Sequence, residues 1–273
     1  MASQRDSSGT SRARSLGAWL AAALVLLVAG GLEAELLVGA AVSLREPLLS
    51  IAEHFEAAHP DAVITLSFGA SSVLAHQIRA GAPIDVFVSA DARLVAPLVT
   101  AGLVAPGDTL PIARNRLVVI ASAQTGQAIA NAADLAGPAV RRIAIPEHAV
   151  PVGRYAREWL GTHQLLERLA PRMLQTEHAR ATLSAVDLGH ADVAIVYATD
   201  AALARSARVA FEVPLGEQPH ILYVAAPLAE SRSLPLARRF VQFLAGDSAQ
   251  RVLGAAGFAS APNSNARDRG KVE

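Results

Sequence analysis

The chain contains no cysteine, so neither a disulfide framework nor lipid attachment to an N-terminal cysteine is available to it. It also lacks an excess of charge of either sign, because 24 basic and 24 acidic side chains give a formal net charge of zero over 273 residues. Binding to nucleic acid needs clustered lysine and arginine, and no basic block stands out. Nucleic acid is therefore excluded as an expected partner.

Residues 1–34 differ in character from the rest. Three arginines precede the apolar run at 16–28, which is followed by small residues up to Ala34. This order is typical of a secretory signal peptide. The alternative, a membrane anchor, is disfavoured because the run is shorter than the ~20 apolar residues of a spanning helix, and no later segment approaches that length. We expect cleavage near Ala34, a soluble mature protein in the periplasm, and a disordered polar tail at 263–273.

Beyond Ala34, short apolar runs alternate with segments of helical period. The runs LLVGAA, AVITLSF and IDVFVSA precede predicted helices at 44–58, 72–80 and 91–102. Further helices are predicted near Asp134, at 152–160, after Pro171, at 178–188 and at 235–245. Continuous apolar runs are typical of parallel strands covered by helices on both faces. The sequence therefore predicts an α/β protein with doubly wound sheets.

The number of strands favours two sheets, and the length suits two lobes of about 100–150 residues each. We expect the chain to cross between lobes near 114–117 and to return near 213–221. Lobe 1 would then contain 35–114 and 218–262, and lobe 2 would contain 115–217. Open α/β sheets bind ligands at the carboxyl ends of their strands, so two facing lobes would form a ligand cleft between their strand-to-helix turns.

Four turns before predicted helices, at 41–44, 69–72, 151–153 and 177–180, are candidates for that cleft. A helix N-terminus leaves up to four N–H groups unpaired and carries a partial positive charge. Hydroxyl donors are added by Ser43, Ser71 and Tyr197, the last at the end of the run ADVAIVYATD. Charge-assisted hydrogen bonds, worth about 1.5–3 kcal/mol each, can offset the cost of burying an anion. Neutral donors alone suit an oxyanion that remains fully ionised.

Five segments resemble the periplasmic molybdate-binding proteins of ABC importers, in the order and spacing of that family: AAVSL, SFGASSVLAHQIRAGAPIDVFVSAD, RNRLVVIA, IPEHAVPVGRYA and ADVAIVYATD. The resemblance covers nearly the whole mature chain. It implies a type II periplasmic binding protein fold, with two lobes closing on molybdate or tungstate. It also implies a monomer without enzymatic activity or cofactor, whose partners are an inner-membrane permease and its cytoplasmic ATPase.

Carried over residue by residue, the resemblance assigns five ligands to the oxyanion: Ser43, Ser71, Val152, Ala179 and Tyr197. The two serines would offer hydroxyl and backbone donors, Val152 and Ala179 backbone N–H groups, and Tyr197 its phenol. Two departures from the family pattern affect the surrounding loops. PEHAVPVG has one extra residue before its Val-Pro pair, and a histidine stands at 178 where an acidic residue is common.

Each hydroxyl also has a purely structural interpretation. Ser43 and Glu46 form an S-x-x-E capping box, which stabilises a helix by about 1 kcal/mol. Ser71 taken alone is most often a helix cap. Tyr197 taken alone is usually a half-buried strand residue. The occurrence of all three in the family's order favours the binding role.

Two other kinds of site remain as alternatives. His148 and His178 could together ligate a metal ion, although loop histidines more often cap helices or face solvent, and we expect no free cation there. A distant alternative is a serine hydrolase that uses Ser43 with His220. The sequence around Ser43 lacks the flanking glycines of the G-x-S-x-G elbow, and no motif supports His220.

A nearer alternative is a receptor of the same fold for sulfate, phosphate or another small anion. Sulfate has the charge and tetrahedral shape of molybdate but is smaller, so cleft size would have to separate them. Phosphate carries a proton near neutral pH and requires an acceptor. The nearest carboxylates in the sequence are Asp85, Asp91 and Asp200, and none of them lies within the candidate turns.

Overall fold

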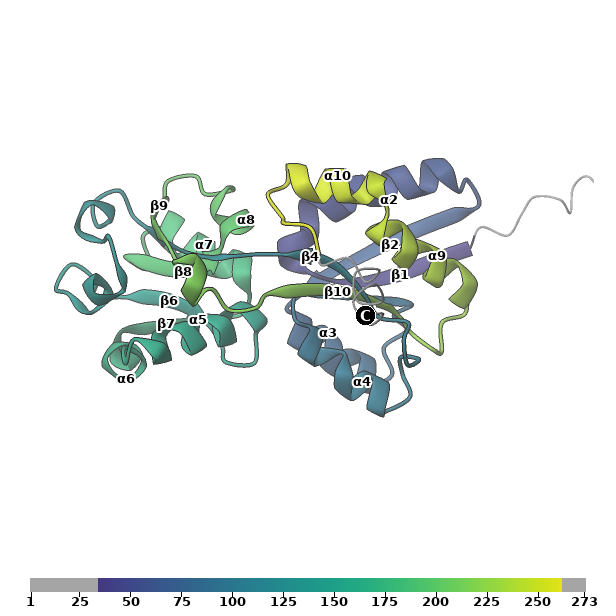
Figure 1. Cartoon of the computed structure of the whole chain (residues 1–273), viewed down its shortest axis with the longest axis horizontal. Helices are drawn as coiled ribbons and strands as arrows, with labels where there is room; N and C mark the ends of the chain where they lie inside the picture. The colour runs from purple at the N-terminus through teal and green to yellow at the C-terminus, as the bar shows by residue number, and fades with distance from the viewer. Residues whose placement is uncertain (1–33, 262–273) are drawn as a thin grey trace, which may run out of the picture.

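The structure, a computed structural model, describes residues 34–261. They form two lobes side by side, each built on one five-stranded sheet with helices against it (Figure 1). The predicted signal peptide, apart from Ala34, and the predicted disordered tail lie outside the described residues. Within 34–261, no helix combines the length and the apolar character needed to cross a membrane.

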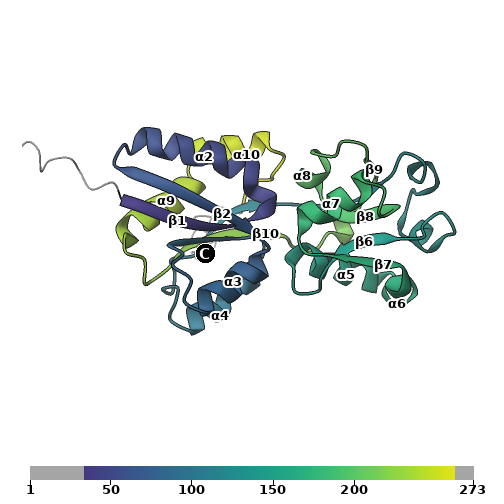
Figure 2. The same ribbon diagram turned by 180° about the vertical axis from the view of Figure 1, so that it is seen from behind.

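The first sheet has the spatial order β2-β1-β3-β10-β4. Its strands are β1 (Ala34–Ala41), β2 (Ala62–Gly69), β3 (Val86–Ser89), β4 (Leu110–Arg114) and β10 (Leu222–Pro227). β1 pairs in parallel with β2 and β3, whereas β10 runs antiparallel to β3 and β4. One face is covered by α2 (Arg45–Ala58), α9 (Leu234–Ala245) and α10 (Asp247–Ala255), and the other by α3 (Ser71–Arg79) and α4 (Ala96–Thr100) (Figure 2).

The second sheet repeats this plan in the order β7-β6-β8-β5-β9. Its strands are β5 (Leu117–Ala121), β6 (Ile143–Pro146), β7 (Met173–Thr176), β8 (Val193–Tyr197) and β9 (Arg208–Glu212). β6 is parallel to β7 and β8, and β5 is antiparallel to β8 and β9. The helices of this lobe are α5 (Pro151–Thr162), α6 (Leu166–Leu169), α7 (Ala179–Asp187) and α8 (Ala198–Ala201). The predicted α/β class with two sheets is confirmed.

Two extended segments connect the lobes, one between β4 and β5 and the other between β9 and β10 (Figure 1). They lie side by side, because the N–H of Asn115 donates to the carbonyl of Ile221 and the N–H of Leu117 donates to the side chain of Gln218, at 3.4 and 2.8 Å.

The sequence-based elements were wrong at the edges of the second sheet. The helix expected after Pro171 is replaced by a short 3-10 turn, Ala170–Arg172, and the edge strand β7. The other edge strand, β9, was not predicted at all. Both strands are half-buried or exposed along most of their length, so neither has the continuous apolar run by which the central strands were recognised.

Several helical segments also differ from expectation. The helix predicted at 91–102 is divided into a 3-10 turn, Ala92–Leu94, and α4, where Pro97 is one of the first residues. The helix predicted near Asp134 is a 3-10 helix, Ala132–Ala136, held by a capping box with Asn131. In the first lobe, α10 was missed, since only Gly246 separates it from α9.

Candidate binding site between the lobes

The five predicted ligand residues all line one cavity between the lobes: Ser43, Ser71, Val152, Ala179 and Tyr197. The remaining lining residues are small, apolar or aromatic: Ala41, Val42, Gly69, Ala70, Ala90, Val150, Pro151 and His178. The cavity volume is about 20 Å³, little more than the ~10–15 Å³ that one ordered water molecule requires. It therefore suits a ligand of a few atoms and not a larger organic molecule.

In the first lobe, two strand-to-helix turns face the cavity. β1 leads into a 3-10 helix, Val42–Leu44, that contains Ser43, and β2 leads into α3, whose first residue is Ser71. The first helical hydrogen bond of α3 joins the N–H of Leu74 to the carbonyl of Ala70, so the N–H groups before Leu74 have no partner within the helix. These groups are available to a ligand.

The second lobe presents two helix N-termini in the same way. Val152 is the second residue of α5, whose first helical bond runs from the N–H of Arg154 to the carbonyl of Val150. Ala179 is the first residue of α7, whose first such bond begins at the N–H of Thr182. The partial positive ends of helices from both lobes therefore meet at one cavity.

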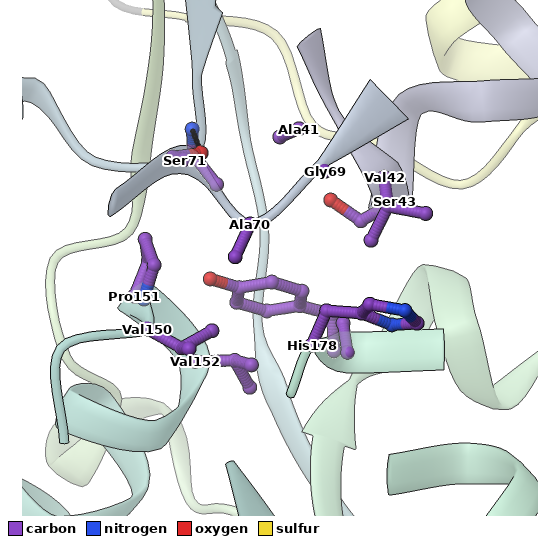
Figure 3. A pocket seen from close by; sticks show the side chains of 13 residues that line it. Ala41, Val42, Ser43, Gly69, Ala70, Ser71, Val150, Pro151, Val152 and His178 are labelled. Carbon is purple, nitrogen blue, oxygen red and sulfur yellow. Dashed lines mark hydrogen bonds between the residues drawn. The ribbon is translucent and has the colours of Figure 1, made fainter. Parts of the chain in front are cut away.

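The serine hydroxyls are not helix caps, so the capping interpretation was wrong for both of them. Neither the 3-10 helix at Ser43 nor α2 has a side-chain cap, and α3 has none. The Oγ of Ser43, a residue that is 3% exposed, lies 2.9 Å from the phenol oxygen of Tyr223. The Oγ of Ser71, which is 1% exposed, accepts the N–H of Ala90 at 3.0 Å. Figure 3 shows the two serines on separate turns at the pocket.

The hydroxyl of Tyr197 is buried without a hydrogen-bond partner among the described residues. Tyr197 ends β8 and is only 1% exposed, so it is not the half-buried strand residue of the structural interpretation. Burial raises the pKa of this phenol well above its usual value, and the group keeps its proton. A buried hydroxyl that lacks a partner costs about 1–3 kcal/mol. The arrangement provides a donor at the cavity wall that an anion would satisfy.

His178 caps α7, as the structural interpretation of loop histidines expects. Its Nδ1 accepts the N–H of Ala181 at 3.1 Å, so the neutral ring carries its hydrogen on Nε2. His178 lines the cavity but His148 does not, so the structure does not bring the two histidines together there. In the part of the chain that the structure describes, no three His, Cys, Asp or Glu residues are grouped for metal binding.

In the part of the chain that the structure describes, no carboxylate lines the cavity, and the three candidate acceptors are engaged elsewhere. Asp85 accepts the N–H of Leu37 at 2.8 Å. Asp91 pairs with the guanidinium of Arg154. The side chain of Asp200 is buried, and its Oδ1 lies 2.9 Å from the Nε of Arg180. The cavity therefore offers donors to a ligand without a carboxylate to accept a ligand proton.

Residues 36–259 match the family described as bacterial extracellular solute-binding proteins. The chain belongs to this family. The molybdate-binding protein ModA of Escherichia coli is 30% identical to it over 252 residues, which cover 89% of this chain and 97% of that protein.

Solved structures agree with the family assignment. The periplasmic molybdate-binding protein of Azotobacter vinelandii has a TM-score of 0.74 at 26% identity, covering 83% of this chain and all of that one. The sulfate-binding protein SubI of Mycobacterium tuberculosis has a TM-score of 0.73 at 18% identity, covering 86% of this chain and 90% of that one, and shows the shared fold alone. The predicted type II periplasmic binding protein fold is confirmed.

Solute-binding proteins of ABC transporters are not enzymes, and the serine hydrolase alternative is wrong for this member. The hydroxyl of Ser43 is bonded to Tyr223. His220, its suggested partner, lines a different cavity together with Asp91 and Glu158. His178 lines the same cavity as Ser43, but its Nδ1 accepts the N–H of Ala181, and no histidine among the described residues is hydrogen-bonded to the Ser43 hydroxyl.

Ion pairs join the two lobes of this solute-binding protein around the cavity. Arg180 of α7 reaches Glu46 of α2 as well as Asp200 within its own lobe. On another side, Arg154 of α5 binds Asp91, which follows β3. Because these contacts cross from one lobe to the other, the structure describes a closed arrangement.

Asp200 makes the stability of the protein depend on pH. Burial raises the pKa of its carboxyl from 3.8 to about 7, against the attraction of Arg180. The folded state then holds this proton more tightly than the unfolded state, so the contribution to stability is complete below about pH 4 and is lost as the pH rises through 7. We expect the Tm of wild type to fall relative to that of D200N as the pH rises from 4 to 8. Scanning calorimetry of both proteins across this range measures the difference. Parallel Tm curves would contradict this.

Two residues behind the cavity were missed by the sequence reasoning. Tyr223 lies in the apolar strand β10, and no pattern in the sequence singles out its hydroxyl. Asn115 lies in the segment RNRLVVIA, which was used only for the family resemblance. The sequence signal was weak, because Asn115 lies between two arginines, two residues before the fully buried strand β5.

Proposed function

We propose that this chain is the extracytoplasmic receptor of an ABC importer for molybdate, and that it also binds tungstate. The observation that carries the proposal is the buried Tyr197 hydroxyl, which has no partner among residues 34–261, at a cavity where helix N-termini of both lobes meet. Relatives named as molybdate-binding proteins, aligned along most of their length, support the choice of oxyanion.

The proposed ligand set is the one expected from the resemblance. The hydroxyls of Ser43, Ser71 and Tyr197 donate to the oxyanion, together with backbone N–H groups at the two serines, Val152 and Ala179. Each charge-assisted bond contributes about 1.5–3 kcal/mol, and several together offset the desolvation of a dianion. The donors come from both lobes, so the ion has an affinity for the closed state that it lacks for the open one.

The lack of a carboxylate at the cavity argues against phosphate as the transported ion. Near neutral pH phosphate carries a proton, which would face only donors and apolar groups here. Sulfate shares the charge and shape of molybdate, and its exclusion would depend on cavity size. Sulfate is therefore the ligand that an experiment must separate from molybdate.

We extend the proposal to the rest of the transport cycle, as the resemblance implies it. The protein is exported with removal of residues 1–34, acts as a periplasmic monomer, and requires no cofactor. Its closed form delivers the ion to an inner-membrane permease driven by a cytoplasmic ATPase.

Isothermal titration of the mature protein, starting at Glu35, with molybdate, tungstate, sulfate and phosphate tests the proposal. We expect tight one-to-one binding of the first two ions and no measurable binding of the last two. Tight binding of sulfate or phosphate would leave the receptor function standing and change the identity of the proposed ligand. Absence of binding by all four ions would overturn the proposal.

A further inference from the structure

A chain of buried hydrogen bonds lies behind Ser43, outside the set of residues that line the cavity. The Nδ2 of Asn115 lies 2.9 Å from the Oγ1 of Thr199 and 3.4 Å from the phenol oxygen of Tyr223. That phenol oxygen lies 2.9 Å from the Oγ of Ser43. Asn115 belongs to the connection between the lobes, so the chain runs from this connection to the cavity wall.

The direction of the chain is set at Asn115. Its Oδ1 accepts the N–H of Arg116 at 2.9 Å, which turns the amide nitrogen toward Tyr223 and Thr199. An amide nitrogen can only donate. The phenol oxygen of Tyr223 is therefore the acceptor in its bond with Asn115.

The hydroxyl of Tyr223 therefore has one hydrogen, which it can donate to one other group. Its side chain is 0% exposed, and burial raises the pKa of the phenol above its ordinary value, so the hydroxyl remains protonated. Among the described residues, the only other hydrogen-bond partner of this hydroxyl is Ser43. Tyr223 donates to the Oγ of Ser43, because the opposite direction would leave its own hydrogen buried and unpaired. The hydrogen of Ser43 is thereby directed away from Tyr223.

The hydroxyl of Ser71 is also held as a donor toward the cavity, but by a different partner. Its Oγ accepts the backbone N–H of Ala90, a group that can only donate. Both serines thus receive a hydrogen bond from behind, and each keeps its own hydrogen for the cavity. At Ser71 the direction comes from the main chain, whereas at Ser43 it depends on two side chains that can be changed.

We propose that Tyr223 and Asn115 are positioning residues that hold the Ser43 hydroxyl as a donor toward the bound oxyanion, and that they thereby favour fully ionised oxyanions over those that carry a proton. The inference rests on the proposed function and adds specificity residues to its site. A serine whose hydrogen points backward would instead present oxygen lone pairs to the ligand. Those lone pairs would repel a fully ionised oxyanion and accept the proton of a protonated one.

The test is a double-mutant cycle of N115D and Y223F, read by isothermal titration with molybdate and with phosphate. N115D places a carboxylate oxygen where the amide donated, so the Tyr223 hydrogen turns to it and the Ser43 hydrogen turns to Tyr223. We expect molybdate affinity to fall roughly 100-fold in N115D and roughly tenfold in Y223F, whereas phosphate, which wild type is not expected to bind measurably, should not lose affinity in either variant. The added charge also repels the ligand, and this repulsion persists in the double mutant. N115D should therefore cost at least fivefold less affinity in the Y223F background than in wild type.

A second cycle, of S43A and Y223F, keeps the proposal testable if N115D does not fold. Without the Ser43 hydroxyl, Y223F should change molybdate affinity less than about twofold, because it then has no hydroxyl to direct. The matched control is T125V, which removes another buried hydroxyl. Thr125 lies beyond the end of β5 that is remote from Tyr197, and T125V should bind molybdate like wild type.

The outcomes separate this inference from the function on which it rests. If wild type binds molybdate and both cycles are additive, the positioning role is overturned and the receptor function stands. If wild type binds sulfate and not molybdate, the proposed ligand is overturned, and the same cycles measured with sulfate decide the positioning role.

Discussion

The double variant S43A/S71A is expected to lose molybdate affinity by more than ~100-fold. Each serine donates a hydroxyl to a buried charge, and loss of one such donor costs about 1–3 kcal/mol, or roughly 5- to 150-fold in affinity. Removal of both leaves one side of the ion with backbone donors alone. Isothermal titration of the single variants and of the double variant measures the effect, with each single variant expected between wild type and the double.

The matched control for this experiment is S72A. Ser72 directly follows Ser71 in α3 but does not line the cavity, and the backbone is unchanged by the substitution. S72A should therefore bind molybdate like wild type. If S43A/S71A bound molybdate within twofold of wild type, the two serine hydroxyls could not be ligands.

G153A is expected to cause the largest loss of stability among conservative substitutions at the site. A Cβ added at Gly153 would lie 2.4 Å from the carbonyl oxygen of Glu147 and 2.5 Å from that of Pro146. Both are backbone atoms, so the loop before α5 would have to move. Overpacking of this kind costs about 1–3 kcal/mol, which lowers Tm by roughly 2–12 °C in a protein of this size. The shift also displaces the N–H of Val152, so affinity for molybdate should fall with stability.

Gly161 provides the control on the same helix. A Cβ there would meet nothing within 4 Å, and G161A should maintain or raise stability, because alanine is favoured over glycine in a helix by about 0.5–1 kcal/mol. Thermal unfolding and titration of both variants test the comparison. Equal stability of G153A and G161A would show that the close backbone approach at Gly153 is not needed.

The central strands and the turns after them could be predicted because their signals are local. β5 and β8 are buried at every position and appear in the sequence as unbroken apolar runs. The edge strands β7 and β9 escaped prediction because strands that are partly exposed have mixed sequences. The shared cavity of the five predicted residues was anticipated from the rule that ligands bind at the carboxyl ends of strands.

The hydrogen-bond partners of the serine hydroxyls could not be predicted from the sequence. S-x-x-E at Ser43 satisfies the local pattern of a capping box, yet Glu46 forms an ion pair with Arg180 and Ser43 bonds to Tyr223. A local motif describes which bonds are possible within one turn. It does not include competing partners that the fold brings from elsewhere.

The sequence by itself determined the fold class and the candidate turns, since these depend on runs of a few neighbouring residues, and it carried the resemblance that assigns five residues to the oxyanion. Only the tertiary structure decided how those residues are held. Tyr223 meets Ser43 across 180 residues of chain, and Arg180 meets Glu46 across 134. Such contacts depend on strand order and on the meeting of the two lobes. Once the groups are buried together, the need of each to satisfy its hydrogen bonds sets the direction in which they donate.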